Sequence, residues 1–162
     1  MDPINAMCPE PPNLRVMLCC LLLVSVQTAT AIESLTGRPV RIISGNALVL
    51  VDSNGIAHRV KLSGIDTQPP NQPWGATARR HLQTLVMGRS VTLIYPGRGR
   101  TEEIHGQLRH GGADINIRLL SAGLARFDPS GLSRTDAERY AAAERRARMK
   151  RLGIWGTTGR ER

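Results

Sequence analysis

A single acidic side chain marks the place where a short strand gives way to a proline-rich loop, in the stretch 60–70 (VKLSGIDTQPP). Val60 and Leu62 alternate with polar residues, which predicts a strand with one buried face. The prolines that follow end the strand, because proline has no amide hydrogen to donate to a ladder. Asp66 therefore stands at the end of the strand, where a carboxylate can bind a cation or cap its own loop.

Six further segments accompany this stretch in a fixed order along the chain. They are the two strands joined at Ser44-Gly45-Asn46, the helix opened by Trp74-Gly75-Ala76, the strand Val91 to Tyr95, Ala113-Asp114-Ile115-Asn116, Ala122-Gly123-Leu124-Ala125, and Ala143 to Arg148 followed by Gly153-Ile154-Trp155. In this order and spacing, the set resembles the thermonuclease, or staphylococcal-nuclease-like, family from about Gly37 to Trp155. The resemblance implies a closed five-stranded OB barrel with about three packed helices, whereas composition alone indicates only an α+β fold.

The resemblance also implies a chemistry, the hydrolysis of a phosphodiester by an activated water and a calcium ion. Calcium binds several oxygen ligands, which typically include two carboxylates. One family carboxylate corresponds to Asp66, which this chain keeps together with Thr67. The other corresponds to Asn46, which retains an oxygen but has no charge. One carboxylate where two are needed predicts a weak calcium site.

The remaining family positions have lost the residue types that the reaction uses. The general base falls at Pro69, which cannot accept a proton, and a general base contributes about 10²–10⁴-fold in rate. The first phosphate-binding arginine corresponds to Lys61, which keeps the charge without the planar two-pronged contact. The family's asparagine corresponds to Asn116. Counting back from it places the second phosphate-binding arginine at Glu103, whose carboxylate repels a phosphate. If that count is shifted, Arg98 or Arg100 provides an arginine from the neighbouring loop.

We therefore predict that the scaffold is retained and that the nuclease machinery is lost. The six family-equivalent positions are Asn46, Lys61, Asp66, Thr67, Pro69 and Glu103, and only Asp66 and Thr67 keep the family's residue. With the base missing, we expect Asp66 to cap its loop and not to bind a metal, so no cofactor is predicted. Calcium is expected as a cofactor only if residual nuclease activity persists. A histidine that substitutes for the catalyst remains an alternative, although the four histidines have no metal-ligand spacing.

The charge of the chain points to a polyanionic partner. The net charge is +9 and the pI is about 10.9, a balance that favours nucleic acid, acidic polysaccharide, lipopolysaccharide or an anionic membrane surface. Aromatic residues make up only 3% of the chain, which disfavours the stacking mode of single-strand binders. Candidate polyanion-binding residues are Lys61, Arg145, Arg148 and Arg151. A solvated lysine and a solvated helix face are the alternative interpretations.

Hydrophobic periodicity and turn residues predict the secondary structure. Five strands are expected at Gly37 to Ile43, Ala47 to Asp52, Ala57 to Ser63, Ser90 to Tyr95 and Glu103 to His110, with a hairpin turn at Asp52-Ser53-Asn54-Gly55. Three helices are expected at Trp74 to Met87, Asn116 to Leu120 and Thr135 to Arg151, the second ended by Gly123 and the third capped by Ser133. We expect the Trp155 side chain to pack into the core at the end of the third helix.

The first 31 residues differ in character from the rest of the chain. Arg15 precedes an apolar run from Val16 to Val26, and Ala29-Thr30-Ala31 supplies the small residues of a cleavage site. The run is too short for a stable membrane span, which needs about 20 apolar residues. We predict a signal peptide over 1–31 and one thermonuclease-like domain over 32–162, in a periplasmic or secreted protein. A buried core helix is the alternative for this run.

Removal of this leader changes what the chain contains. All three cysteines, Cys8, Cys19 and Cys20, lie within it, so the mature protein would have neither disulfides nor a cysteine-ligated zinc site. The remaining 131 residues carry 21 basic and 11 acidic side chains, a net charge of +10. That length is enough for one domain with a sizeable core.

Three functions from different classes are compatible with these observations. The first is an exported, non-catalytic OB-barrel protein that binds nucleic acid or another polyanion. The second is a residual or altered phosphodiesterase. The third is an envelope accessory protein, for example in exopolysaccharide biosynthesis or export, in which the barrel is an interaction module. The retained basic charge favours the first and third, whereas the altered turn and the lost base weigh against the second; the oligomeric state is left open.

The first testable prediction is that the mature protein begins near Ile32 and is exported. The motive is the small-residue cleavage site that follows the apolar run. Intact-mass measurement of the periplasmic or secreted form checks it, with the mass of the full chain as the reference. A cytoplasmic protein that retains Cys19 and Cys20 would contradict the prediction.

Overall fold

The computed structural model describes residues 32–97 and 102–156. The predicted signal peptide and the alternative arginines, Arg98 and Arg100, lie outside these ranges. The elements in chain order are β1 (Ile32–Ile42), β2 (Ala47–Asp52), β3 (Ala57–Leu62), β4 (Ile65–Asp66), α2 (Pro73–Val86), β5 (Val91–Pro96), β6 (Glu103–His110), β7 (Ala113–Asp114), α3 (Ile115–Ser121), β8 (Arg126–Phe127), α4 (Arg134–Met149) and the 3-10 turn η1 (Gly153–Trp155).

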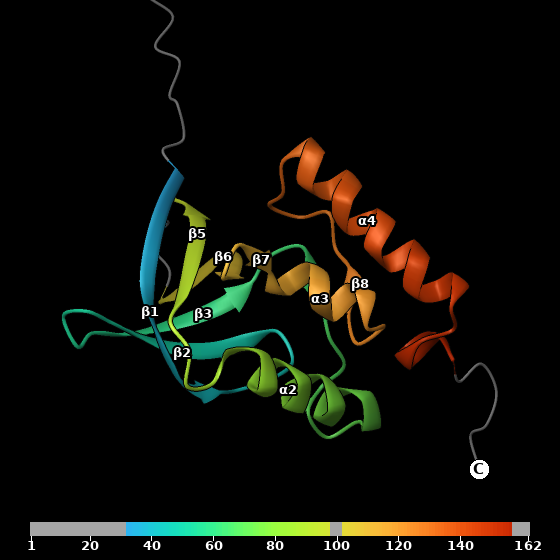
Figure 1. The fold of residues 1–162 in the computed structure, drawn as a ribbon, viewed down its shortest axis with the longest axis horizontal. Helices are drawn as coiled ribbons and strands as arrows, with labels where there is room; N and C mark the ends of the chain where they lie inside the picture. Colours follow the sequence, from blue (N-terminus) through green and yellow to red (C-terminus); the bar gives the residue numbers. More distant parts are fainter. Residues whose placement is uncertain (1–31, 98–101, 157–162) are drawn as a thin grey trace, which may run out of the picture.

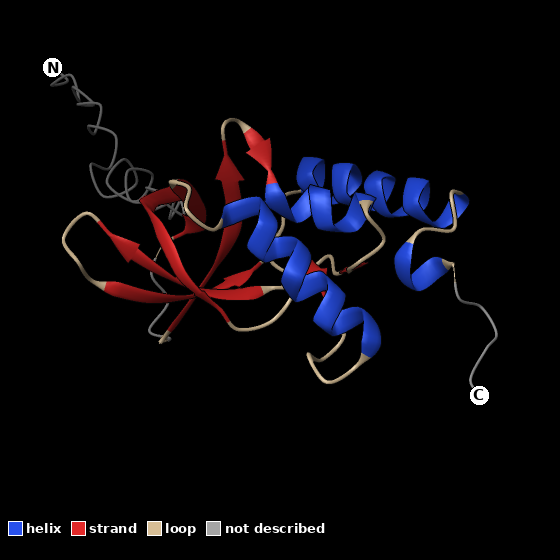
Figure 2. Cartoon of the chain, turned by 60° about the horizontal axis from the view of Figure 1, so that its bottom comes forward, coloured by secondary structure: helices blue, strands red, loops and turns tan. Residues whose placement is uncertain are grey.

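The longer strands form one curled sheet that closes on itself. Its order is β3-β2-β1-β5-β6-β7, and an additional pairing between β3 and β6 joins the two ends. Neighbouring strands are antiparallel, except that β3 and β6 run parallel. Figure 1 shows α3 lying between the barrel and α4, and Figure 2 shows the helices gathered on one side of the sheet. The predicted α+β class, the OB barrel and the three helices are confirmed.

Strand β1 begins at Ile32, five residues before the predicted start at Gly37. Residues 32–36 alternate weakly in hydrophobicity, but they pair with β5 from Ile32↔Pro96 to Gly37↔Val91. The strand then pairs with β2, and a register shift between Pro39 and Arg41 marks an irregularity at Val40. A strand that joins two neighbours at a bend in this way helps a sheet to curl into a barrel.

Local signals explain where the helices begin. Helix α2 has Pro73 in its first turn, where the missing amide hydrogen costs nothing. The Ser133 side chain accepts a hydrogen bond from the Asp136 amide at 3.1 Å, which confirms the predicted cap of α4. Helix α3 begins at Ile115, one residue earlier than expected, because the Asp114 carboxylate caps it through the Ile117 amide. No helix in the described ranges is long and apolar enough to cross a membrane.

Two buried polar contacts tie the helices to the barrel. The Tyr140 hydroxyl donates to the Asp114 carboxylate at 3.0 Å, and this contact joins α4 to the start of α3. Burial of the phenol and the nearby carboxylate raise the pKa of Tyr140, so the hydroxyl keeps its proton. The Asn116 side chain is 0% exposed; it donates to the Ser63 carbonyl at 2.8 Å and accepts from the Leu108 amide at 3.2 Å. A single side chain therefore connects α3, β6 and the end of β3.

The second prediction is that Asn116→Ala lowers the free energy of unfolding by about 2–4 kcal/mol, since it leaves two buried backbone groups without partners. Urea unfolding followed by circular dichroism measures the change. Asn71→Ala, at an exposed loop position, is the matched control and should cost less than about 0.5 kcal/mol. Equal stabilities of the two variants would contradict the role assigned to Asn116.

Candidate functional site

The loop between β1 and β2 lies against the segment that follows β4. Gly45 is buried, and a Cβ atom added to it would lie 2.6 Å from the Ala78 Cβ and 3.0 Å from the Thr67 side chain. Only glycine allows the loop to approach that closely. The Asn46 carbonyl accepts a hydrogen bond from the Leu62 amide at 2.8 Å. The structure therefore brings Asn46, Asp66 and Thr67 to one end of the barrel, as the family pattern implies.

The side chain of Asn46 is occupied by the scaffold. It is only 7% exposed. Its Oδ1 accepts from the Ser44 hydroxyl at 2.9 Å, and its Nδ2 donates to the Ile65 carbonyl at 3.4 Å. Both ends of the amide thus hold the loop against β4, which leaves little of it to offer a ligand.

Asp66 is exposed, and within the described ranges its carboxylate accepts no hydrogen bond. The expectation that it caps its own loop is therefore wrong, because a cap requires a bond to a backbone amide. Pro69 is also exposed, and its carbonyl accepts from the Gln72 amide at 2.9 Å in the turn before α2. The loop consequently presents one free carboxylate and no second acid or base at Pro69.

These donors do not fit a calcium ion. Calcium takes six to eight oxygen ligands as a rule, with carboxylates carrying most of the charge. Here Asp66 is the free carboxylate, and the amide oxygen of Asn46 is buried in a hydrogen bond. Within residues 32–97 and 102–156, no group of three or more histidine, cysteine, aspartate or glutamate side chains is arranged to hold a metal ion.

The parallel pairing of β3 and β6 decides which residues face Lys61. Its partner across the strands is His105, whereas Glu103 is paired with Arg59. Partners in a parallel pair point to the same face, so His105 lies beside Lys61. The count along the chain had assigned the second phosphate-binding position to Glu103. Strand register depends on hairpin lengths, so a count across a hairpin does not determine which side chains meet.

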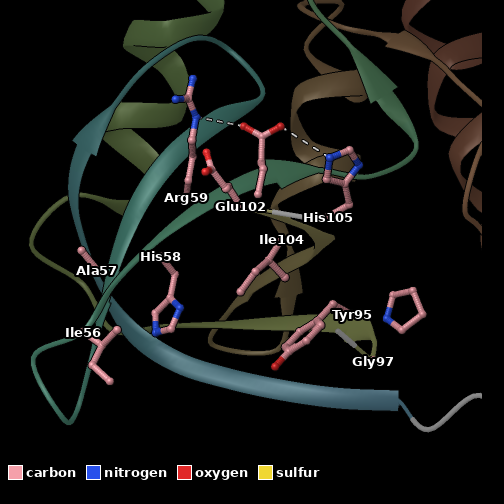
Figure 3. A pocket seen from close by; sticks show the side chains of 11 residues that line it. Ile56, Ala57, His58, Arg59, Tyr95, Gly97, Glu102, Ile104 and His105 are labelled. Carbon is pink, nitrogen blue, oxygen red and sulfur yellow. Dashed lines mark hydrogen bonds and ion pairs between the residues drawn. The ribbon is translucent and has the colours of Figure 1, made fainter. Parts of the chain in front are cut away.

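Glu103 lies two residues before His105 on the same face of this pairing and belongs to a polar cluster there. Its carboxylate lies 3.1 Å from the Arg59 Nε and 3.4 Å from the His105 Nε2. Figure 3 shows Arg59 and His105 turned toward one carboxylate at the mouth of a cavity of about 550 Å³. The charges at this cavity are thus largely satisfied by one another.

Besides His105, Lys61 has an acidic neighbour, Asp128, that the sequence did not indicate. The Ser130 hydroxyl and amide bind the Asp128 carboxylate and, together with the positive charge of Lys61, hold the pKa of Asp128 below its ordinary value. Asp128 is therefore ionised near neutral pH and offsets part of the charge of Lys61. An acidic loop residue this far along the chain becomes a neighbour only through the fold.

The basic residues in and after α4 differ in their exposure and in whether they pair with a carboxylate or an aromatic ring. Arg145 and Arg146 are exposed. Arg148 pairs with the Glu144 carboxylate at 3.1 Å and lies 4.0 Å from the centroid of the Trp155 ring. Arg151 follows the helix with a φ of 51°, in the left-handed region that favours glycine. Trp155 was expected to pack into the core. It is only half-buried, and part of its ring contacts arginine side chains instead.

A second cavity adjoins Asp66 and includes a residue that the sequence did not single out. Its volume is about 240 Å³, and Arg126 borders it from β8. Strands β4 and β8 form a two-stranded sheet in which Asp66 is paired with Arg126. Strands of two residues have no detectable periodicity, so no local signal announces this pairing.

The closed barrel, its three helices and a loop with one free aspartate beside a basic surface define a thermonuclease-like OB-fold protein. The profile of the family described as "Staphylococcal nuclease homologue" matches residues 48–157, more than half of the chain. The chain therefore belongs to the staphylococcal nuclease family. The matched range begins just after Asn46 and includes the other five family-equivalent positions.

Several curated proteins resemble this chain. A protein from Escherichia coli named "Uncharacterized endonuclease" is 33% identical over 90 residues, which cover 55% of this chain and 58% of that protein. "Probable endonuclease LCL3" from Pyricularia oryzae is 27% identical over 117 residues, or 62% and 44% of the two chains. "Staphylococcal-like nuclease CAN1" from Arabidopsis thaliana is 27% identical over 104 residues, or 64% and 31%. The match thus spans between about a third and three-fifths of these relatives.

The third prediction is that Asn46→Asp lowers the free energy of unfolding by about 1–2 kcal/mol, because a carboxylate cannot donate to the Ile65 carbonyl. Calcium at about 1 mM, which loads weak sites, should not restore the loss because the other ligands are missing. Thermal unfolding with calcium and with chelator measures both effects, and Asn71→Asp is the exposed control. A variant that calcium stabilises above the unmodified protein would show that the site is one carboxylate short of binding calcium.

Proposed function

We propose that this protein is an exported member of the staphylococcal nuclease family that binds nucleic acid without hydrolysing it. The observation that carries the proposal concerns the end of the barrel where Asn46, Asp66 and Pro69 lie. Asp66 is free, but Asn46 is hydrogen-bonded into the scaffold and Pro69 supplies no base. Metal, base and phosphate-binding groups act as a unit in such a reaction, so the loss of any one of them already removes much of the rate, and the separate costs do not multiply.

Nucleic acid is the partner that the family and the charge support together. The relatives that carry descriptive names are called nucleases or endonucleases. The chain carries a net charge of +9, and exposed arginines lie along α4. Neutralising phosphates releases counterions, and this release drives binding that is insensitive to sequence. The proposal of export rests on the predicted signal peptide over 1–31, which is a prediction from the sequence alone.

A second candidate is a residual phosphodiesterase. The endonuclease names of the relatives and the unpaired carboxylate of Asp66 favour it. In this alternative the reaction depends on Asp66, with Lys61 and His105 facing the substrate. The two candidates differ in whether bound nucleic acid is cut.

The fourth prediction is that the mature protein binds a single-stranded oligonucleotide and leaves it intact. Affinity should fall steeply between about 50 and 200 mM salt, since phosphate contacts are electrostatic. Charge reversal at Arg145 should weaken binding, whereas Arg134→Glu, the same change at the far end of α4, is the control and should have less effect. Fluorescence anisotropy measures binding, and gel analysis of the same samples measures cleavage.

Two results would overturn this proposal. The first is salt-independent binding or a strong preference for one base sequence. The second is turnover that calcium switches on, that a chelator stops and that Asp66→Ala abolishes, in protein purified away from contaminating nucleases. That second result would establish the phosphodiesterase instead.

A further inference from the structure

The residue Arg126 occupies a position that the proposed function does not yet use. It is exposed on β8, borders the cavity of about 240 Å³ and is paired across the strands with Asp66. Paired residues of antiparallel strands point to the same face, so the two side chains share one side of this small sheet. Within the described ranges, no carboxylate lies within ion-pairing distance of Arg126. Its charge is available to a ligand.

The indole of Trp155 supports this arginine. The Arg126 guanidinium lies 5.7 Å from the centroid of the ring, within the range of a cation–π contact. Arg148 lies over the same ring at 4.0 Å, but its charge is already paired with Glu144. A guanidinium that rests on an aromatic face keeps its N–H groups free at the edge, where they match two phosphate oxygens. Of the two arginines, Arg126 is thus the one able to bind an anion.

The backbone fixes the position of the indole. The Ile154 amide donates to the Gly123 carbonyl at 2.9 Å, and the Trp155 amide donates to the Leu152 carbonyl at 3.0 Å. Gly123 lies directly before the segment Leu124–Ala125 that leads into β8. Trp155 and Arg126 are therefore held by the same small piece of structure. Such support reduces the entropy that the arginine loses when it binds.

The rest of the cavity supplies further hydrogen-bond donors. Thr67, Gln68 and Gln72, whose side chains carry hydrogen-bond donors, are among the residues that line it, and Asp66 is the only acidic residue among them. The two non-bridging oxygens of a phosphodiester, with its two ester oxygens, are arranged tetrahedrally around phosphorus, so they accept from more directions than the two oxygens of a planar carboxylate do. A cavity that offers hydroxyl, amide and guanidinium donors therefore suits a phosphate better than it suits a carboxylate of an acidic polysaccharide.

We propose that Arg126 is a phosphate-binding residue and that this cavity holds one phosphodiester of a nucleic acid. The proposal rests on the proposed function, which supplies the nucleic acid, and adds the place where one phosphate is bound. Asp66 repels that phosphate and limits its affinity. Because the guanidinium supplies the positive charge, the proposed binding needs no divalent metal.

The experiment compares Arg126→Ala with Arg80→Ala, which removes the same charge from an exposed position on α2 outside the cavity. The probe is a fluorescein-labelled oligothymidylate of about 12 nucleotides, a length typical of OB-fold sites, in chelator. Arg126→Ala should lose about tenfold in affinity relative to Arg80→Ala, since one charge-assisted contact disappears. The slope of log K against log salt should fall by about 0.7. Arg126→Lys should bind with an intermediate affinity because it keeps only the charge.

A variant at Asp66 tests the sign of its effect. In chelator, Asp66→Asn should strengthen binding by about threefold, because it removes one negative charge near the phosphate. A ligand that instead donates a hydrogen bond to the Asp66 carboxylate would be bound more weakly by Asp66→Asn. Weaker binding would overturn the proposal.

The fluorescence of Trp155 provides a readout that a purely structural role would not change. In a Trp74→Phe background, Trp155 is the only tryptophan, so addition of oligothymidylate should shift its emission. The shift should disappear in Arg126→Ala, whose circular dichroism should match that of the parent. A shift that persists without Arg126 would contradict the assignment.

The outcomes separate this inference from the function on which it rests. If the unmodified protein binds oligothymidylate and Arg126→Ala equals Arg80→Ala, the cavity assignment fails and nucleic-acid binding stands. If the unmodified protein does not bind oligothymidylate at about 50 mM salt, the proposed function fails. Arg126-dependent binding of the carboxylate polymer alginate, without binding of oligothymidylate, would overturn the phosphate assignment.

Discussion

The architecture depends on the closure of the barrel between β3 and β6, which Asn116 secures from α3. Its amide binds the Ser63 carbonyl and the Leu108 amide at the same time, in a place from which water is excluded. Directly after Ser63, Gly64 has a φ of 76° and packs beneath Leu132 and Tyr140. The chain can therefore turn at this point into β4. The contact that closes the barrel consequently also sets where Asp66 emerges.

At the same end of the barrel, the loop around Asn46 is held by hydrogen bonds of its own side chain. A carboxylate at position 46 would only accept hydrogen bonds, and beside the Ile65 carbonyl it would need a cation to neutralise it. The Asn46 amide donates to that carbonyl and accepts from the Ser44 hydroxyl, so the loop is satisfied without an ion. The asparagine at position 46 therefore stabilises the loop without a cation.

Features that depend on local sequence could be predicted, and those that depend on pairing between distant segments could not. Strands β2 and β6 have the predicted bounds because their alternation and flanking turns are local. The cap at Ser133 is local in the same sense. In contrast, the neighbours of Lys61, which are His105 and Asp128, follow from strand register and loop path. The pairing of Asp66 with Arg126 is also non-local, and two-residue strands carry no pattern that would reveal it.

The distribution of free and occupied side chains favours recognition of phosphates over recognition of bases. Trp155 carries two arginines on its ring, and Trp74 packs against the core, so neither ring is an open platform for a base. Arg148, Arg59 and Arg139 are each paired with a carboxylate, whereas Arg126 and Arg145 have no ion pair within the described ranges. A surface that offers unpaired guanidinium groups, but no aromatic ring on which a base can stack, recognises the charge and the spacing of phosphate groups. Such a surface gains its affinity from the backbone of a polyanion and remains indifferent to its sequence.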